Sequence, residues 1–180
     1  MWSVTTNINV VVGNPRADSR TLLVAAGLAR RLSSAQDVAI GDVVDLASHS
    51  AGIFAWPNPE LDELVQRVGT SKILIVASPV YKGAYTGLLK AFFDRFDSDG
   101  LAGVTAIPVM TVGSPAHSLA AEMSLRPLLV ELGASVPTQS LVFSTSQFAN
   151  VEQILDEWTQ ANIQPHGAVL GPRLRNEPSS

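Results

Sequence analysis

The chain has 180 residues, of which 46% are hydrophobic and 16% charged, as expected of one compact domain with a substantial core. A net charge of −4 gives no electrostatic reason to expect nucleic acid or an anionic membrane as a partner, and the absence of cysteine excludes disulfides, thiolate catalysis and cysteine-based zinc sites. The N-terminal residues lack a signal-peptide pattern and no apolar run approaches the roughly 18 residues that span a bilayer, so we expect a cytoplasmic protein without a membrane partner.

Five short apolar runs recur at intervals of about thirty residues, the length of a βα unit, and predict strands at 8–12, 37–46, 72–78, 104–112 and 134–143. The third run is uniformly apolar, as a strand buried on both faces should be. The second and fifth runs are interrupted by polar residues, and Pro137 lacks the N–H that a central strand requires. We therefore predict that the second and fifth strands are edge strands or interrupted strands, with Pro137 at an edge or bulge position.

Helices are predicted between and after these strands, at about 19–33, 58–69, 84–97, 115–133 and 150–162. The second helix has the clearest boundaries, with Asn58 as N-cap, Pro59 at the first helical position and Gly69 at the end. Asn150 and Gln153 have the spacing of a capping box at the start of the last helix.

The alternation of strands and helices predicts an α/β fold, with a parallel sheet covered by helices on both faces. We expect a single domain over residues 1–165 and a frayed tail at 166–180, which has no hydrophobic periodicity. Sheets of this kind bind ligands outside the carboxyl ends of their strands. The residues that follow each strand are therefore the candidate functional residues.

After the first strand, the segment GNPRADSRT (13–21) leads into a helix whose free N–H groups and positive dipole end favour an anion. Its side chains add donors suited to phosphate: Arg16, Ser19, Arg20 and Thr21. The alternative is that Asp18 or Ser19 only caps the helix and the arginines are solvated. Neither a G-x-G-x-x-G nor a P-loop pattern is present, which disfavours a dinucleotide-binding Rossmann fold and a P-loop nucleotidase.

After the third strand, the segment SPVYKGAYTG (78–87) predicts a loop whose backbone can approach a planar, partly polar ligand. Gly83 and Gly87 are expected to allow unusual backbone dihedrals, and Tyr81 offers an amphipathic surface. Lys82 has two interpretations, a steering charge for an anion or an ordinary exposed lysine.

After the fourth strand, the segment TVGSPAHS (111–118) predicts a turn at Gly113 and Ser114 into the next helix. We interpret His117 as a surface residue, because no acidic residue at metal-ligand spacing accompanies it, and we expect no metal site. The strand ends thus suit a cofactor with a phosphate at one end and a flat ring at the other. They suit hydrolysis poorly, since no nucleophile–base pair is evident, and we nominate no catalytic residue.

At these residues the sequence resembles the NAD(P)H-dependent FMN reductase family of flavodoxin-like proteins. The family's phosphate loop, G-S-x-R-x-x-S, corresponds to GNPRADS, with Asn14 in place of serine. Its second motif, P-x-Y-x-x-x-x-x-G, is matched by Pro79, Tyr81 and Gly87. The segment SPVYKGAYTGLLK is especially similar to the flavin reductases of alkanesulfonate-utilisation systems, and the resemblance extends over roughly residues 8–160.

The resemblance implies a flavodoxin-like three-layer sandwich with a five-stranded parallel sheet in the strand order 2-1-3-4-5. It also implies positions for FMN. The phosphate is expected on Asn14, Arg16, Ser19, Arg20 and Thr21. The isoalloxazine ring is expected on Pro79, Val80, Tyr81, Lys82 and Gly83. Its other side is expected to meet Thr111, Gly113 and Ser114.

The implied function is transfer of a hydride from NADPH or NADH to FMN, with the reduced flavin supplied to a partner monooxygenase. One alternative is an enzyme that retains its FMN and reduces quinones, azo dyes or metal oxyanions. A second is a flavodoxin-type electron carrier without enzymatic activity, although 16 acidic against 12 basic residues is a weak excess for such a carrier. A third is a nucleotide-binding regulatory domain without flavin.

Two features predict subunit contacts. The apolar stripe of the helix at 84–97 is interpreted as core or subunit interface, and its width predicts a homodimer or homotetramer: Leu88, Leu89, Phe92, Phe93 and Phe96. Pro127 lacks an N–H, so the carbonyl of Met123 loses its helical donor and a kink or π-bulge is expected there. In the alkanesulfonate-type reductases that the chain resembles, such a bulge lies beside the flavin at a subunit interface and carries an inserted tyrosine. Met123 stands at that position here, so the resemblance implies the backbone bulge and freely exchanging FMN but not the tyrosine contact. The alternative is a kink that only shapes packing.

Overall fold

The computed structural model describes residues 7–163. Its centre is one parallel sheet of five strands in the order β2-β1-β3-β4-β5, which confirms the predicted order and the two predicted edge strands. The strands are β1 (Asn7–Val12), β2 (Ala39–Asp45), β3 (Ile73–Pro79), β4 (Thr105–Val112) and β5 (Leu141–Ser144). The central strand β3 is buried along its whole length, as its uniformly apolar sequence predicts.

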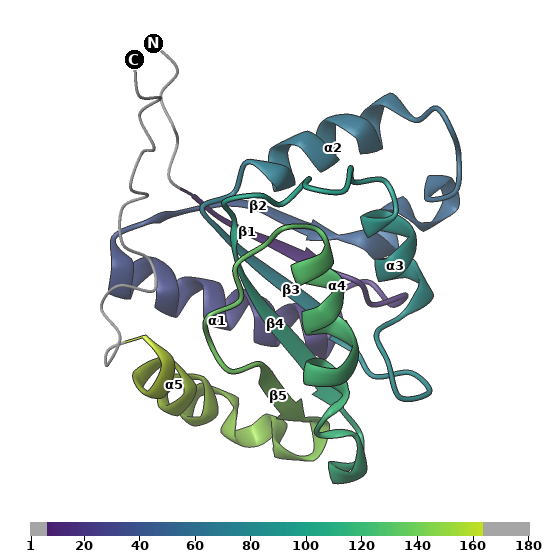
Figure 1. The fold of residues 1–180 in the computed structure, drawn as a ribbon. Helices are drawn as coiled ribbons and strands as arrows, with labels where there is room; N and C mark the ends of the chain where they lie inside the picture. The colour runs from purple at the N-terminus through teal and green to yellow at the C-terminus, as the bar shows by residue number, and fades with distance from the viewer. Residues whose placement is uncertain (1–6, 164–180) are drawn as a thin grey trace, which may run out of the picture.

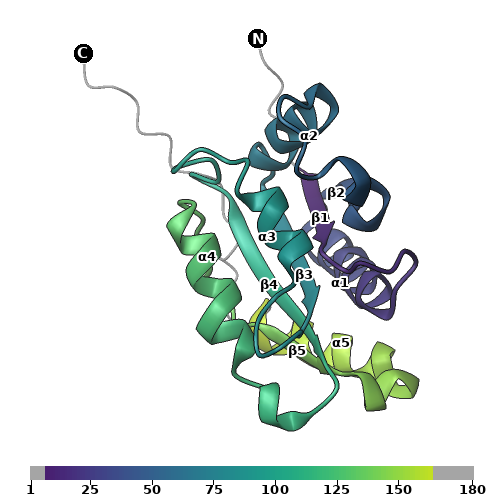
Figure 2. The ribbon, with the colours of Figure 1, turned by 90° about the vertical axis from the view of Figure 1, so that its right-hand side faces the viewer.

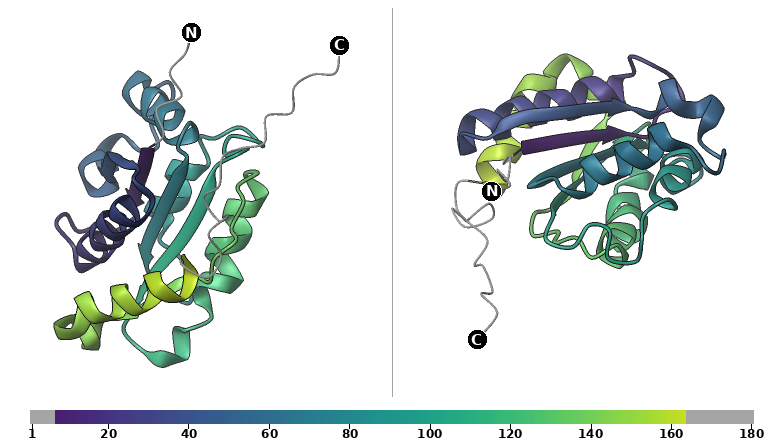
Figure 3. Two further views of the ribbon diagram at one scale, coloured as in Figure 1. Left: turned by 90° about the vertical axis from the view of Figure 1, so that its left-hand side faces the viewer. Right: turned by 90° about the horizontal axis from the view of Figure 1, so that it is seen from above.

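Helices cover both faces of the sheet and make three layers, as Figure 1 and the view from above in Figure 3 show. One face carries α1 (Arg20–Gln36) and α5 (Val151–Asn162), and the other carries α2 (Pro59–Gly69), α3 (Gly87–Phe93) and α4 (Arg126–Glu131). Successive residues of β1 point into opposite layers, because side chains alternate along a strand. Val10 and Val12 pack under α1 and α5, whereas Val11 packs under α2 and α3. In the described range, no helix has the length and apolar character needed to cross a membrane.

The helix caps confirm one prediction and correct another. Asn58 caps α2 by accepting a hydrogen bond from Leu61 N–H at 3.3 Å, with Pro59 in the first turn, as predicted. The predicted capping box at the start of α5 is wrong, because the side chain of Asn150 makes no cap hydrogen bond. The amide of Gln153 instead donates to Glu157 at 2.8 Å, one turn further along the exposed surface of α5.

The fifth strand is shorter than the predicted 134–143. Only Leu141–Ser144 pairs with β4, and Ser135 makes a single isolated bridge to Thr105. Between Ser135 and β5, a side chain of α4 rather than a strand takes up two backbone carbonyls. The guanidinium of Arg126 donates to the carbonyl oxygens of Val136 and Thr138, at 2.6 and 2.7 Å.

The fourth helical region is broken where Pro127 predicts a break. A 3₁₀ turn, η2 (Pro115–His117), is followed by a π-helix, η3 (Ala121–Leu125), and then by α4. The N–H of Arg126 bonds the carbonyl of Ala121, five residues back, and Pro127 offers no N–H for the carbonyl of Met123. The predicted π-bulge near Met123 is therefore confirmed.

An ion pair joins this π-helix to α4 and to the segment before β5. The guanidinium of Arg126 donates to both carboxylate oxygens of Glu122 and thereby lowers the pKa of Glu122 to about 2. Ser140 N–H donates to the same carboxylate at 3.1 Å. Glu122 therefore stays ionised throughout the neutral pH range. Its bond to Ser140 N–H attaches the segment just before β5 to η3.

Helix α3 is shorter than the predicted 84–97, because Thr86 is its N-cap and the chain leaves the helix after Phe93. The phenylalanine stripe lies inside the chain's own core. Phe92 and Phe93 are fully buried, and Phe96 packs against them with ring centroids 5.6 and 5.2 Å away. The stripe therefore leaves little apolar surface for a partner subunit, and its predicted second role does not follow from this structure.

A buried arginine fixes the segment that links the 3₁₀ helix η1 (Leu46–Gly52) to α2. The guanidinium of Arg95 donates to the carbonyls of Ile53 and Ala55, at 3.4 and 3.0 Å, and to Asp62 at 2.7 Å. It also lies 4.0 Å from the centroid of the Trp56 ring. The Arg95 side chain is 0% exposed, whereas that of Asp62 is 45% exposed. The arginine is therefore fully desolvated, while the aspartate still contacts solvent.

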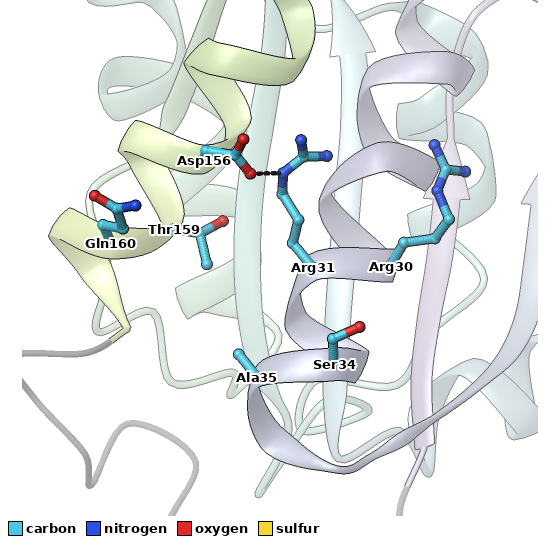
Figure 4. A pocket seen from close by; sticks show the side chains of 7 residues that line it. All are labelled: Arg30, Arg31, Ser34, Ala35, Asp156, Thr159 and Gln160. Atoms are coloured by element: carbon cyan, nitrogen blue, oxygen red, sulfur yellow. Dashed lines mark hydrogen bonds and ion pairs between the residues drawn. The ribbon is translucent and has the colours of Figure 1, made fainter.

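A shallow hollow of about 420 Å³ lies between α1 and α5 (Figure 4). Arg31 bridges it by pairing with Asp156 at 2.6 Å and with Glu152 at 2.9 Å, and the Asp156 carboxylate raises the pKa of Arg31. The hollow is formed by the C-terminal halves of these two helices, which lie toward the amino ends of the strands. It is therefore separate from the strand ends at which this kind of sheet binds ligands.

Candidate functional site

The loops that follow β1, β3 and β4 come together at the carboxyl edge of the sheet (Figure 2). They enclose a cleft of about 700 Å³, a size typical of small-molecule sites. The cleft also receives a residue from the turn after β5. Its lining consists of Asn14, Arg16, Ala17, Asp18, Ser19, Arg20, Thr21, Pro79, Val80, Tyr81, Thr111, Gly113 and Thr145.

The start of the 17-residue helix α1 forms one wall. Ser19 is the N-cap, and its hydroxyl oxygen accepts a hydrogen bond from Leu22 N–H at 3.2 Å. The N–H groups of Arg20 and Thr21 belong to the first turn and have no intrahelical acceptor, and none is found for them among residues 7–163. This wall therefore offers free backbone donors at the positive end of a helix dipole.

Two arginines stand at this wall, and both are exposed. The guanidinium of Arg20 lies 5.1 Å from the centroid of the Phe148 ring, in the turn η4 (Thr145–Asn150), which holds it at the rim. Asp18, between the arginines, has a left-handed φ of 51° and donates its N–H to Asp45 at 3.2 Å. Arg16 and Arg20 together outweigh the one carboxylate of the cleft, which favours an anionic ligand.

A buried polar chain forms the floor between the loops. The amide nitrogen of Asn14 donates to the Thr21 hydroxyl at 3.2 Å, and this hydroxyl lies 2.7 Å from that of Thr111. The side-chain oxygen Oδ1 of Asn14 accepts from Arg16 N–H at 2.9 Å. All three side chains are thus oriented by one another, and they tie the loop after β1 to the start of α1 and to the end of β4.

The loop after β3 forms the facing wall. Val80 N–H donates to the carbonyl of Thr111 at 2.9 Å and continues the pairing of β3 with β4 by one residue. Tyr81 is 49% exposed beside the cleft, whereas Tyr85 packs against the core below the loop. Gly83 has the unusual dihedral that was predicted, with φ of 87°, but Gly87 begins α3 and has none.

All of the predicted ligand residues line this cleft except Lys82, Gly83 and Ser114. Lys82 and Gly83 form the tip of the loop after β3, and Ser114 caps η2 by accepting from Ala116 N–H at 3.3 Å. Next to it, Gly113 has open space where a Cβ would lie, so the chain here leaves room for a ligand. Thr145 was missed because candidate residues were sought only after the first, third and fourth strands; its position just after β5 is the signal that identifies it.

His117 is exposed in η2 and does not line the cleft. Across residues 7–163, no group of three histidine, aspartate or glutamate side chains could hold a metal ion. The arrangement of the cleft therefore offers anion binding at one wall, a half-exposed aromatic at the other, and uncharged donors and acceptors between them.

Proteins named as FMN reductases align with most of this sequence. An NADH-dependent FMN reductase, SfnF, of Pseudomonas putida is 34% identical over 163 residues, which cover 82% of this chain and 88% of the relative. An FMN reductase (NADPH) of Pseudomonas aeruginosa is 30% identical over 158 residues, with 86% and 84% covered.

The fold is also similar to that of a flavin reductase of known structure. The crystal structure of the NADH:FMN oxidoreductase EMOB in its apo form superposes with a TM-score of 0.76 at 30% identity, over 94% of this chain and 97% of that one. The sequence profile described as NADPH-dependent FMN reductase matches residues 6–148, which include every residue of the cleft. The chain therefore belongs to the NADPH-dependent FMN reductase family.

Proposed function

We propose that this protein is an NAD(P)H-dependent FMN reductase that uses the cleft after β1, β3 and β4 as its flavin site. One observation carries the proposal: the same cleft contains the N-terminus of α1 with two arginines on one wall and the loop after β3 with the half-exposed Tyr81 on the other. FMN has a phosphate and a flat ring at its two ends. The relatives at 30–34% identity that are named FMN reductases support the same function.

The residues present fit FMN. Arg16, Ser19 and the free N–H groups of the first turn of α1 provide donors for a phosphate dianion. Pro79, Val80 and Tyr81 provide backbone groups and an aromatic edge for the ring. The hydroxyl and amide groups of Asn14, Thr21 and Thr111 lie on the floor between these two walls and would be available to the polyol chain that links the phosphate to the ring.

When bound, FMN would supply the redox chemistry, which is acceptance of a hydride from a reduced nicotinamide. The protein's role is to bind the flavin, to orient it and to shield it from solvent. The titratable side chains that line the cleft are Arg16, Asp18, Arg20 and Tyr81, and no nucleophile–base pair is found among the residues described there. We therefore assign no catalytic residue.

The proposed function is tested by steady-state oxidation of NADH and NADPH with free FMN, FAD, riboflavin or a quinone as acceptor. We expect oxidation that depends on FMN. A protein that oxidises neither nicotinamide in the presence of any flavin, although it binds FMN, contradicts a reductase and favours an electron carrier.

We further propose that FMN exchanges freely and that the reduced flavin is delivered to a separate monooxygenase. The open position of Tyr81 supports exchange, because a half-exposed wall leaves the ring incompletely covered within one chain. We expect purified protein to lose its visible flavin spectrum on extensive dialysis. Retention of one FMN per chain is the contrary result, and it favours a reductase of quinones or azo compounds with a resident flavin.

A homo-oligomer is also proposed, although on a different surface from the phenylalanine stripe. Leu119, Met123 and Val130 are 67%, 75% and 55% exposed; Leu119 precedes η3, Met123 lies in η3 and Val130 lies in α4. We expect light scattering at micromolar concentration to give a mass well above that of one 19.0 kDa chain. The variant with Leu119→Glu and Met123→Glu should shift to the monomer mass, and a monomeric wild type contradicts the proposal.

A further inference from the structure

The loop after β3 contains a small hairpin that is rigid by itself. Tyr81 and Ala84 exchange two backbone hydrogen bonds, at 2.9 and 3.3 Å. Lys82 and Gly83 between them have positive φ angles of 54° and 87°, as in a two-residue type I′ turn. The Tyr81–Ala84 hairpin therefore moves as one body, and its position depends on the two points at which it is attached.

One attachment lies at each end of the hairpin. On the side of Val80, the backbone bonds the end of β4 at Thr111. On the other side, Thr86 N–H donates to the hydroxyl of Ser78 at 3.0 Å, and the Thr86 hydroxyl donates to the carbonyl of Gly13. Both Thr86 and Ser78 are buried. The second attachment is thus a pair of side-chain hydrogen bonds rather than sheet pairing.

Gly13 connects this attachment to the opposite wall of the cleft. It is the first residue of the phosphate loop, which we define as Gly13–Ser19, and its N–H bonds Ala77 at 2.8 Å. A Cβ at Gly13 would lie 2.4 Å from that of Leu89, in the first turn of α3. Because the two segments are already in contact, a displacement of the start of α3 is passed directly to the phosphate loop.

We propose that Thr86 is a positioning residue that fixes the hairpin relative to the phosphate loop, so that one flavin mononucleotide can engage both walls at once. The inference rests on the proposed FMN site. Two linked contacts reinforce each other only when their spacing matches the ligand, and a loosened spacing loses the joint binding while each separate contact survives. Thr86 does not line the cleft and acts through its bonds to Ser78 and Gly13; its hydroxyl also caps α3 by accepting from Leu89 N–H at 3.2 Å.

The test compares FMN with riboflavin, which has the ring and polyol but lacks the phosphate. Thr86→Val removes the hydroxyl at nearly constant shape, and with it both the bond to Gly13 and the cap of α3, whereas Thr86→Ser keeps both. Dissociation constants are measured on the apoprotein from the quenching of flavin fluorescence. In Thr86→Val we expect the preference for FMN over riboflavin to fall about 10-fold or more, with riboflavin binding changed by less than about 3-fold. Thr86→Ser should restore the wild-type preference.

A matched control separates positioning from stability. Thr159 is also buried, and its hydroxyl bonds the carbonyl of Leu155 at 2.7 Å within α5, away from the cleft. Thr159→Val should lower thermal stability and leave the FMN-to-riboflavin preference unchanged. The preference is insensitive to a partly unfolded population, because both ligands bind the same folded molecules.

The remaining outcomes count against the positioning role of Thr86 or against the proposed function. An equal loss of affinity for both flavins in Thr86→Val, or an unchanged preference, overturns the positioning role. If Thr86→Val fails to fold, Ser78→Ala removes the acceptor of Thr86 N–H and leaves the cap of α3 in place, and an unchanged preference in that variant overturns the proposal in the same way. Wild-type protein that binds neither flavin refutes the proposed function itself rather than the role of Thr86.

Discussion

A protein carrying Arg16→Ala and Ser19→Ala is expected to bind FMN about 100-fold or more weakly than the wild type. Each charge-assisted hydrogen bond to phosphate contributes about 1.5–3 kcal/mol, and the double variant removes at least one from each residue. Isothermal titration of the apoprotein with FMN measures the change. Riboflavin, which lacks the phosphate, should bind the variant and the wild type with similar affinity.

Ser19 has a second role that this experiment must separate. Its hydroxyl caps α1, so Ser19→Ala also removes a cap worth about 1 kcal/mol of stability. Ser19→Asp preserves the cap, since aspartate is an equally good N-cap residue, but it places a negative charge against the phosphate. We expect Ser19→Asp to melt no lower than the wild type and yet to lose FMN affinity.

A control on the same helix completes the test. Arg30 is exposed in the C-terminal half of α1, outside the cleft, and Arg30→Ala should leave FMN affinity unchanged. If Ser19→Asp and the double variant both bind FMN as the wild type does, the phosphate does not lie at the start of α1. The assignment of Arg16, Ser19, Arg20 and Thr21 to the phosphate then fails as a whole.

Asp62→Ala is expected to destabilise the folded protein by about 3 kcal/mol, although the aspartate itself is nearly half exposed. The reason lies in its partner. Arg95 is fully buried, and without the Asp62 carboxylate its charge keeps only two carbonyl oxygens and the face of Trp56. An ionised group that is buried without its counter-charge costs far more than a lost surface pair. Urea unfolding followed by circular dichroism measures the difference.

Two variants make the prediction specific. Asp42 pairs with Arg67 at 3.0 Å on the surface, where both side chains are partly hydrated, and Asp42→Ala should cost less than about 1 kcal/mol. Arg95→Met removes the buried charge together with the need to pair it, so it should destabilise the protein less than Asp62→Ala does. Equal costs for Asp62→Ala and Asp42→Ala contradict the view that burial of Arg95 governs the effect.

Several features of the fold could be predicted from the sequence because their causes are local. Asn58 and Pro59 mark the start of α2, and Gly69 marks its end. The π-helix follows from the covalent structure of Pro127, which removes a donor wherever the helix packs. The position of the cleft follows from the alternation of strands and helices, since a parallel sheet gathers the residues after its strands at one edge.

The sequence by itself thus determined the α/β class, the central strands and most of the lining of the cleft, whose residues are all neighbours of strand ends. Only the tertiary structure decided where β5 begins, because Arg126 and Glu122 bind backbone groups that the sequence pattern assigned to a strand. It alone decided that Arg95 is buried and that Thr86 bonds Gly13, 73 residues away. Hydrophobic periodicity and capping patterns describe a residue by its neighbours along the chain, whereas these hydrogen bonds depend on which distant backbone groups the packed sheet and helices bring within reach.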